Sequence, residues 1–250
     1  MKLALLLFCA GLMGLGLTLI LWTQPRFLLS IPDHWIPGVL YFAETEEKLV
    51  ALTIDDGPDA VTTPKILTVL DRYDAHATFF VISGHIPGNE ALVETMVREG
   101  HELGNHLTED RPSILLSPAE FEAAVLEADD LISQFGEWRW LRPAAGWYNS
   151  AMVSIAQRHN YQVVLGDLFP FDTHIASSRF AARHILQNLA PGSIVVLHDR
   201  GERGERTAAT LEQVLPQISA QGYRVVTLTE LFRDSQESSA DRAFSLREKT

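Results

Sequence analysis

The feature that most constrains the fold is a short apolar run ending in two adjacent carboxylates and a Gly-Pro break. It covers residues 49–58 and delivers Asp55 and Asp56 to its end. A short apolar run bounded by a turn signal is typical of a strand in a parallel sheet that is covered on both faces. Neighbouring strand side chains point to opposite sides, so the two acids can face one centre only if the strand bends, which Gly57 permits. The alternative interpretation is a β-turn built on Asp-Gly-Pro.

The rest of the chain alternates between strand-like and helix-like segments. Strands are predicted at 77–83, 102–105, 140–144, 161–166, 193–198 and 223–227, and helices at 63–73, 90–99, 117–135, 150–159, 178–189 and 207–220. The helix at 117–135 opens with a capping box, Ser117 followed by Glu120. Such alternation favours an α/β domain with mostly parallel strands. We expect a distorted (β/α)7 barrel over residues 49–234.

The N-terminus is apolar and without charge from Leu3 to Trp22. About twenty such residues span a bilayer core of roughly 30 Å as a helix. Because no clear Ala-x-Ala cleavage site follows, residues 1–24 favour a transmembrane helix that holds the rest of the chain outside the cytoplasm. The alternative is a signal removed on secretion. Residues 25–48, with three prolines, are predicted to be an irregular connector, and the polar residues 235–250 a disordered tail.

The net charge and the cysteine content exclude some classes of partner and site. The chain of 250 residues has a formal net charge of -12, which disfavours nucleic acid as a partner because nucleic acid requires a basic patch. The single cysteine, Cys9, lies within the N-terminal apolar run, so neither a disulfide framework nor a cysteine metal site is expected. The sequence gives no indication of the oligomeric state.

Four further residues have side chains suited to metal binding or proton transfer. His106 and Asp110 are four residues apart, so on a helical turn they would share a face and could hold one ion, or they could be a surface pair. Arg142, at a predicted strand end, could orient a carboxylate or form a structural salt bridge. His198 ends another predicted strand and is a candidate proton donor, or a buried histidine bonded to backbone.

Two aspartates follow a different predicted strand. Asp167 and Asp172 lie in the segment LGDLFPFD, residues 165–172. Because they leave the end of a strand, either could orient His198. The sequence alone leaves both open.

The order of these features resembles the polysaccharide deacetylase family, also called the NodB-homology domain or carbohydrate esterase family 4. Its Thr-Phe-Asp-Asp-Gly motif is matched at 53–57, and its Gly-His-Glu-x-Gly-Asn-His motif at 100–106. The later Arg-x-Pro-Tyr-Gly and Leu-His motifs are similar to 142–146 and 196–198. The chain departs from the family where Leu107 replaces Ser or Thr, where Asp110 replaces a second histidine, and where Thr173 follows Asp172 in place of tryptophan.

The resemblance implies a role for each matching residue. Asp56 and His106 would bind a metal ion, with Asp110 as the third ligand. Asp55 would be the general base and Arg142 its partner. His198 would be the general acid, oriented by Asp172 or less favourably by Asp167. A main-chain N–H near Ala145 would stabilise the oxyanion, and loss of the family tyrosine leaves that donor in place.

The implied cofactor is one divalent ion. Zinc is expected first, and two carboxylates beside one imidazole also suit manganese, cobalt or magnesium. The implied reaction removes N-acetyl groups from an N-acetylated sugar or polysaccharide, such as peptidoglycan, a chitin-like polymer or a surface glycan. Trp147, Tyr148 and Val196 are candidate substrate contacts, or packing residues. The alternatives are an esterase or amidase acting on a small substrate and a catalytically weak or inactive glycan-binding relative.

Overall fold

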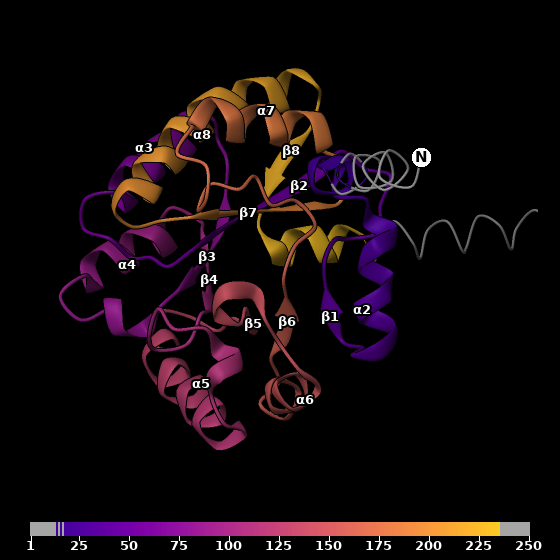
Figure 1. Cartoon of the computed structure of the whole chain (residues 1–250). Helices are drawn as coiled ribbons and strands as arrows, with labels where there is room; N and C mark the ends of the chain where they lie inside the picture. The colour runs from indigo at the N-terminus through magenta and orange to yellow at the C-terminus, as the bar shows by residue number, and fades with distance from the viewer. Residues whose placement is uncertain (1–13, 15, 17, 236–250) are drawn as a thin grey trace, which may run out of the picture.

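The computed structural model describes residues 14, 16 and 18–235 (Figure 1). Within them one sheet runs in the order β1-β6-β5-β4-β3-β2-β7, with β8 also paired to β2, and every ladder is parallel. The strands are β1 (Val39–Leu40), β2 (Leu49–Asp55), β3 (Ala77–Val81), β4 (Glu102–Asn105), β5 (Trp140–Leu141), β6 (Gln162–Val164), β7 (Ser193–His198) and β8 (Arg224–Val226). The predicted parallel α/β fold is confirmed.

The sheet forms an incomplete barrel. Its ladder begins at β1 and ends at β7. The described residues join these two sides only through isolated bridges, Phe42 with Ser193 and Leu168 with Val195. The expected distorted barrel is therefore confirmed as a half-barrel of parallel strands with an irregular seam beside β7.

Helices follow most strands and pack on the outside of the sheet (Figure 1). They are α3 (Thr63–Arg72), α4 (Glu90–Arg98), α5 (Pro118–Ile132), α6 (Ser150–Arg158), α7 (Ser178–Asn188) and α8 (Gly201–Ala220), with short 3-10 turns η2 (Ser83–His85), η3 (Ser113–Leu115) and η4 (Ala144–Gly146). The predicted capping box forms in both directions: Ser117 N donates to Glu120 Oε2 at 2.8 Å, and Glu120 N donates to Ser117 Oγ at 3.3 Å.

Helix α8 begins at Gly201, six residues before the predicted start. The segment 201–206, GERGER, has no apolar residue and two glycines, so a search for apolar periodicity finds the helix only from Thr207. The early start is important because it places the first turn of α8 directly after the end of β7.

The central strand β2 is buried along its whole length, as the apolar run predicts. Val50, Leu52 and Ile54 pack in the large core cluster beneath the helices. Leu49 and Ala51 belong to a second cluster inside the curved sheet. Burial on both faces fixes the position of β2, and with it the position of the two acids at its end.

The structure does not support the predicted N-terminal transmembrane helix. Residues 18–23 are helical, and no helix in the described part of the chain is long and apolar enough to span a membrane. Most of the predicted transmembrane segment, 1–13 with 15 and 17, lies outside the described residues, as does 236–250 of the predicted tail.

The prediction of an irregular connector at 25–48 is wrong. This segment contains η1 (Arg26–Leu29), α2 (Ser30–Trp35) and β1, which pairs with β6. Its prolines suggested irregular chain, but Pro32 lies in the first turn of α2, where no helical N–H is lost.

Candidate active site

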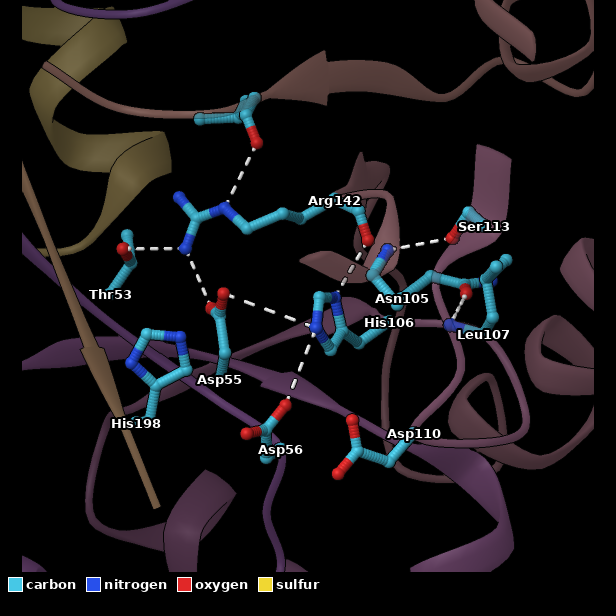
Figure 2. A network of polar contacts seen from close by, with 12 residues as sticks. Thr53, Asp55, Asp56, Asn105, His106, Leu107, Asp110, Ser113, Arg142 and His198 are labelled. Carbon is cyan, nitrogen blue, oxygen red and sulfur yellow. Dashed lines mark hydrogen bonds and ion pairs between the residues drawn. The ribbon is translucent and has the colours of Figure 1, made fainter. Parts of the chain in front are cut away.

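A cleft of about 510 Å³ opens at the carboxyl ends of the central strands. Most of the predicted site residues line it: Asp55, Asp56, His106, Asp110, Arg142, Ala145, Trp147, Asp172, Val196 and His198. Strand register brings the first of them together. Asp55 on β2 is the register partner of His198 on β7, and Asn105 on β4 is the partner of Leu141 on β5, so His106 and Arg142 leave neighbouring strands at the same level (Figure 2).

The chain bends after β2 at Asp56 itself. Its φ is 75°, whereas Gly57 has no positive φ, so the expectation that Gly57 makes the bend is wrong. Other non-glycine residues beside the cleft share this left-handed backbone: Leu107, Ala145, Phe171 and Arg200. Such conformations cost free energy and persist where the surrounding structure holds them, often at functional sites.

Asp55 is held by a buried arginine. Arg142 Nη1 donates to Asp55 Oδ1 at 2.6 Å and to Thr53 Oγ1 at 2.8 Å, while its Nε donates to Val164 O at 3.0 Å (Figure 2). The guanidinium also lies over the Phe80 ring, 4.1 Å from its centroid. The pair keeps the Asp55 carboxylate in one orientation, and the Asp55 Oδ2 atom remains on the His106 side.

Asp56 and His106 present a second pair of donor atoms. His106 Nδ1 donates to Arg142 O at 2.7 Å, which in the neutral ring leaves the Nε2 lone pair 3.6 Å from Asp56 Oδ1 (Figure 2). Burial lowers the pKa of His106, but Asp55 and Asp56 outweigh burial and raise it. Burial raises the pKa of Asp56, but its contact with His106 and nearby positive charges hold that pKa below its usual value.

His198 is paired with Asp172. Asp172 Oδ2 lies 3.0 Å from His198 Nδ1 and also accepts the His198 backbone N–H at 3.0 Å. Burial lowers the pKa of His198, but Asp172 and the more distant Asp55 and Asp56 raise it overall. His198 can therefore carry a proton at a pH where an ordinary histidine has lost it.

The less favoured alternative, Asp167, does not orient His198. Its carboxylate accepts from Arg26 Nε at 2.6 Å and from Ile194 N at 2.8 Å. Burial raises the pKa of Asp167 in spite of these partners. Asp167 therefore fixes the N-terminal segment to β7, because its side chain is fully engaged away from the cleft.

Asp110 lies apart from the other predicted ligands. Its side chain is half exposed, and Asp110 Oδ2 is 3.5 Å from Nη2 of Arg203. The same guanidinium reaches Asp56, with Nη1 2.9 Å from Asp56 Oδ2. Across the described residues, no three His, Cys, Asp or Glu side chains are close enough to hold one metal ion. The predicted helical turn that would join Asp110 to His106 is absent, since residues 106–107 have no regular structure.

The remaining predicted contacts divide between cleft and core. Trp147 is 69% exposed and lines the cleft, and Val196 lies buried at its floor. Tyr148 does not line the cleft, because its hydroxyl is bonded to that of Tyr41 and it packs against a core cluster. Ala145 lies on the η4 turn, where its neighbour Ala144 donates its N–H to Ser113 Oγ at 2.7 Å.

Sequence reasoning missed several residues of the site. They are Thr53, Ser113, Phe169, His174 and Arg203. The sequence could have indicated Arg203, because it lies only five residues after His198, the last residue of a predicted strand. It could also have indicated Thr53, since Thr53 lies two residues before Asp55 on the same strand and therefore on the same face. Ser113, Phe169 and His174 contact the site through long-range packing, for which the local sequence gives no pattern.

Two of the three predicted ligands, Asp56 and His106, are placed so that they could bind one divalent cation. Asp56 Oδ2 is buried and accepts no hydrogen bond in the described structure, although Arg203 lies near it as an ion pair. His106 is fixed by a backbone carbonyl so that Nε2 faces the same carboxylate, an arrangement common for metal-binding histidines. Asp110 would have to exchange its contact with Arg203 to become a third ligand.

At one mouth of the curved parallel sheet lie two adjacent aspartates, one of them paired with a buried arginine. Beside them are one histidine fixed by a backbone carbonyl and another paired with a carboxylate, an arrangement suited to a hydrolase. The sequence model of the polysaccharide deacetylase family matches residues 42–164. A peptidoglycan-N-acetylglucosamine deacetylase of Bacillus cereus is 35% identical over 198 residues, covering 78% of this chain and 93% of that protein. The chain belongs to the polysaccharide deacetylase family.

Solved structures agree with this assignment. A peptidoglycan N-acetylglucosamine deacetylase in complex with an N-hydroxybenzamide matches with a TM-score of 0.74 and 26% identity over 78% of this chain and 93% of that one. A family 4 acetyl xylan esterase from Clostridium thermocellum, in complex with a cobalt ion, matches with a TM-score of 0.68 and 30% identity over 74% and 91%.

Proposed function

We propose that this protein is a metal-dependent hydrolase that removes N-acetyl groups from N-acetylglucosamine units of a glycan, with peptidoglycan as the first candidate substrate. The observation that carries the proposal is the convergence of Asp55, His106 and His198 with Asp56 on one cleft, each fixed by a partner of its own. The printed name of the Bacillus cereus relative supports the choice of peptidoglycan.

Asp56 and His106 would hold the divalent ion, with Asp110 as the candidate third ligand. When bound, such an ion supplies Lewis-acid polarisation of the acetyl carbonyl and makes a water acidic enough to attack at neutral pH. Zinc remains the first expectation, with manganese, cobalt and magnesium as alternatives. The cobalt complex of the acetyl xylan esterase supports a divalent ion without fixing which one.

The protein side chains would move the protons. Asp55, oriented by Arg142, would take a proton from the attacking water. His198, held by Asp172, would give a proton to the departing amine nitrogen. A backbone N–H at Ala145, on the left-handed η4 turn, would bind the oxygen that becomes negative in the transition state.

The proposed substrate fits the form of the cleft. Trp147 offers an exposed indole at the mouth for contact with a sugar ring, and Val196 closes the floor beneath it. We assign residues 49–234 to the hydrolase domain. Its peptidoglycan-directed relatives favour a site of action outside the cytoplasm, reached by membrane anchoring or by secretion.

The proposal is tested by acetate release from peptidoglycan fragments and chitooligosaccharides, with the purified protein supplied with zinc, cobalt or manganese. Asp55→Asn should lower the rate by roughly 100-fold or more, because a positioned base contributes at least that much. The exposed Asp71→Asn on α3, which removes the same charge far from the cleft, should leave the rate unchanged. Turnover of small acetyl esters alone would instead indicate an esterase, and glycan binding without acetate release would indicate an inactive relative.

A further inference from the structure

Arg203 reaches two of the three predicted metal ligands from the first turn of α8. Its Nη1 lies 2.9 Å from Asp56 Oδ2 and its Nη2 lies 3.5 Å from Asp110 Oδ2. The side chain is 32% exposed, so it extends from the rim of the cleft to the buried acid. Two basic side chains of the chain itself, Arg203 and His106, therefore lie beside the Asp56 carboxylate.

The local charges explain why an arginine is stable there. Asp55 has its own buried partner in Arg142 at 2.6 Å. Asp56 and Asp110 then share the Arg203 guanidinium as their cation, and Asp56 is only 6% exposed. An unpaired buried carboxylate is costly, so the guanidinium offsets at that point the charge that a divalent ion would otherwise offset.

The geometry of the contact argues against a supporting role for Arg203 in metal binding. A residue that orients a metal ligand from outside does so through a directed hydrogen bond to that ligand. Asp56 Oδ2 accepts no hydrogen bond in the described structure, so its contact with Arg203 is an ion pair without hydrogen-bond geometry. A divalent ion bound at the same oxygen would lie beside the guanidinium and repel it.

The Arg203 side chain can also move away from Asp56 toward solvent. Its second contact, Asp110, is 50% exposed, and the arginine side chain itself is partly in solvent. The guanidinium can turn to the solvent side, where Asp110 still offers it a partner, and the ion would then compensate the buried acid, which is costly to leave unpaired. The buried acid, by contrast, gains a stronger partner when the ion arrives.

We propose that Arg203 and the divalent ion are alternative partners of Asp56, so that the ion binds only when the arginine withdraws from the site. This inference rests on the proposed function, because it concerns the same metal site. It makes the occupancy of the site depend on a residue outside the ligand set, and it predicts that the native chain binds metal more weakly than its ligands alone would allow.

The test measures Co²⁺ affinity of the full chain by isothermal titration calorimetry, with the visible absorption of bound Co²⁺ as a second readout. Arg203→Gln should bind Co²⁺ at least about tenfold more tightly than the native protein, which is about 1.4 kcal/mol. Arg203→Lys keeps the charge and should remain close to the native affinity. Arg179→Gln, an exposed arginine on α7, makes the same change of net charge away from the cleft and should have no effect.

The outcomes separate this inference from the function on which it rests. Equal Co²⁺ affinity in the native protein and Arg203→Gln, with acetate release intact, overturns the competition and leaves the deacetylase. Weaker binding by Arg203→Gln also overturns it, because it shows that the arginine supports the ligand. Absence of Co²⁺ binding in every variant, together with absence of acetate release, overturns both proposals.

Discussion

The two sides of the cleft are built differently. The inner side consists of Asp55, Arg142 and His106, which are nearly inaccessible to solvent. Arg142 and His106 are bonded to backbone carbonyls, and Asp55 is bonded to Arg142. The outer side carries Asp110, Arg203 and Trp147, which are partly or largely exposed. The inner residues match the family motifs, and the outer side holds the departure from them. Under the proposed function, the strands would hold the proton-transfer groups, whereas the loops and α8 would set how the ion and the substrate enter.

Removal of the inner arginine should give the largest effect. Arg142→Met leaves the Asp55 carboxylate buried without its 2.6 Å partner, so the free energy of unfolding should fall by about 3–5 kcal/mol. Urea denaturation followed by circular dichroism measures this change. Arg139→Met, three residues before Arg142 in the chain, breaks an exposed pair with Asp129 and should cost about 0–1 kcal/mol. Equal losses in both variants would contradict the contrast between the two sides.

The Asp172–His198 pair should give an intermediate effect with a defined pH dependence. Asp172 raises the pKa of His198, so the proton needed by the leaving group persists above the ordinary histidine range. In Asp172→Asn that pKa should fall, which moves the alkaline limb of the pH profile of kcat/KM to lower pH and lowers the rate about tenfold at mildly alkaline pH.

The control for this pH profile is again Asp71→Asn, which removes a carboxylate from the exposed face of α3. Its alkaline limb should coincide with that of the native protein. A profile of Asp172→Asn that keeps its shape, with only a uniform loss of rate, would show that Asp172 serves folding rather than the protonation of His198.

The smallest effect is expected on the outer side. Trp147→Ala removes an exposed ring and no buried contact, so it should raise KM for a glycan oligomer about threefold, less than about 1 kcal/mol, with stability unchanged. Steady-state kinetics with oligomers and with a single N-acetylated sugar measure it. A fall in kcat with KM unchanged would indicate instead that the indole acts near the reacting atoms.

Much of the fold was predictable because it follows from local pattern. The run at 49–55 is apolar on both faces, and β2 is buried on both faces. The capping box at Ser117 formed as predicted. The predictions were wrong where the local sequence has no clear pattern. The start of α8 was missed because the helix begins in a polar, glycine-containing segment. The strand β1 was missed because it has only two residues and is a strand through its pairing with β6.

The site shows the same division. The sequence named Asp55, Arg142 and His198 because each stands at a predicted strand end, and His106 because of its spacing from Asp110. A parallel sheet gathers strand ends at one edge. The residue pattern left Asp167 and Asp172 open, and the family resemblance favoured Asp172. Both follow β6, and only the path of the chain between them, with a left-handed Phe171, decides which carboxylate meets His198.

The sequence by itself determined the class of fold and the family, and it named the candidate site residues, because these depend on apolar periodicity and on residue types in a fixed order. The tertiary structure alone decided that Asp56 bends the strand end and that Arg203 lies against Asp56 while Asp110 faces outward. Those facts depend on the register between neighbouring strands and on charge pairing between residues far apart in the chain. Neither can be recognised from a short stretch of sequence.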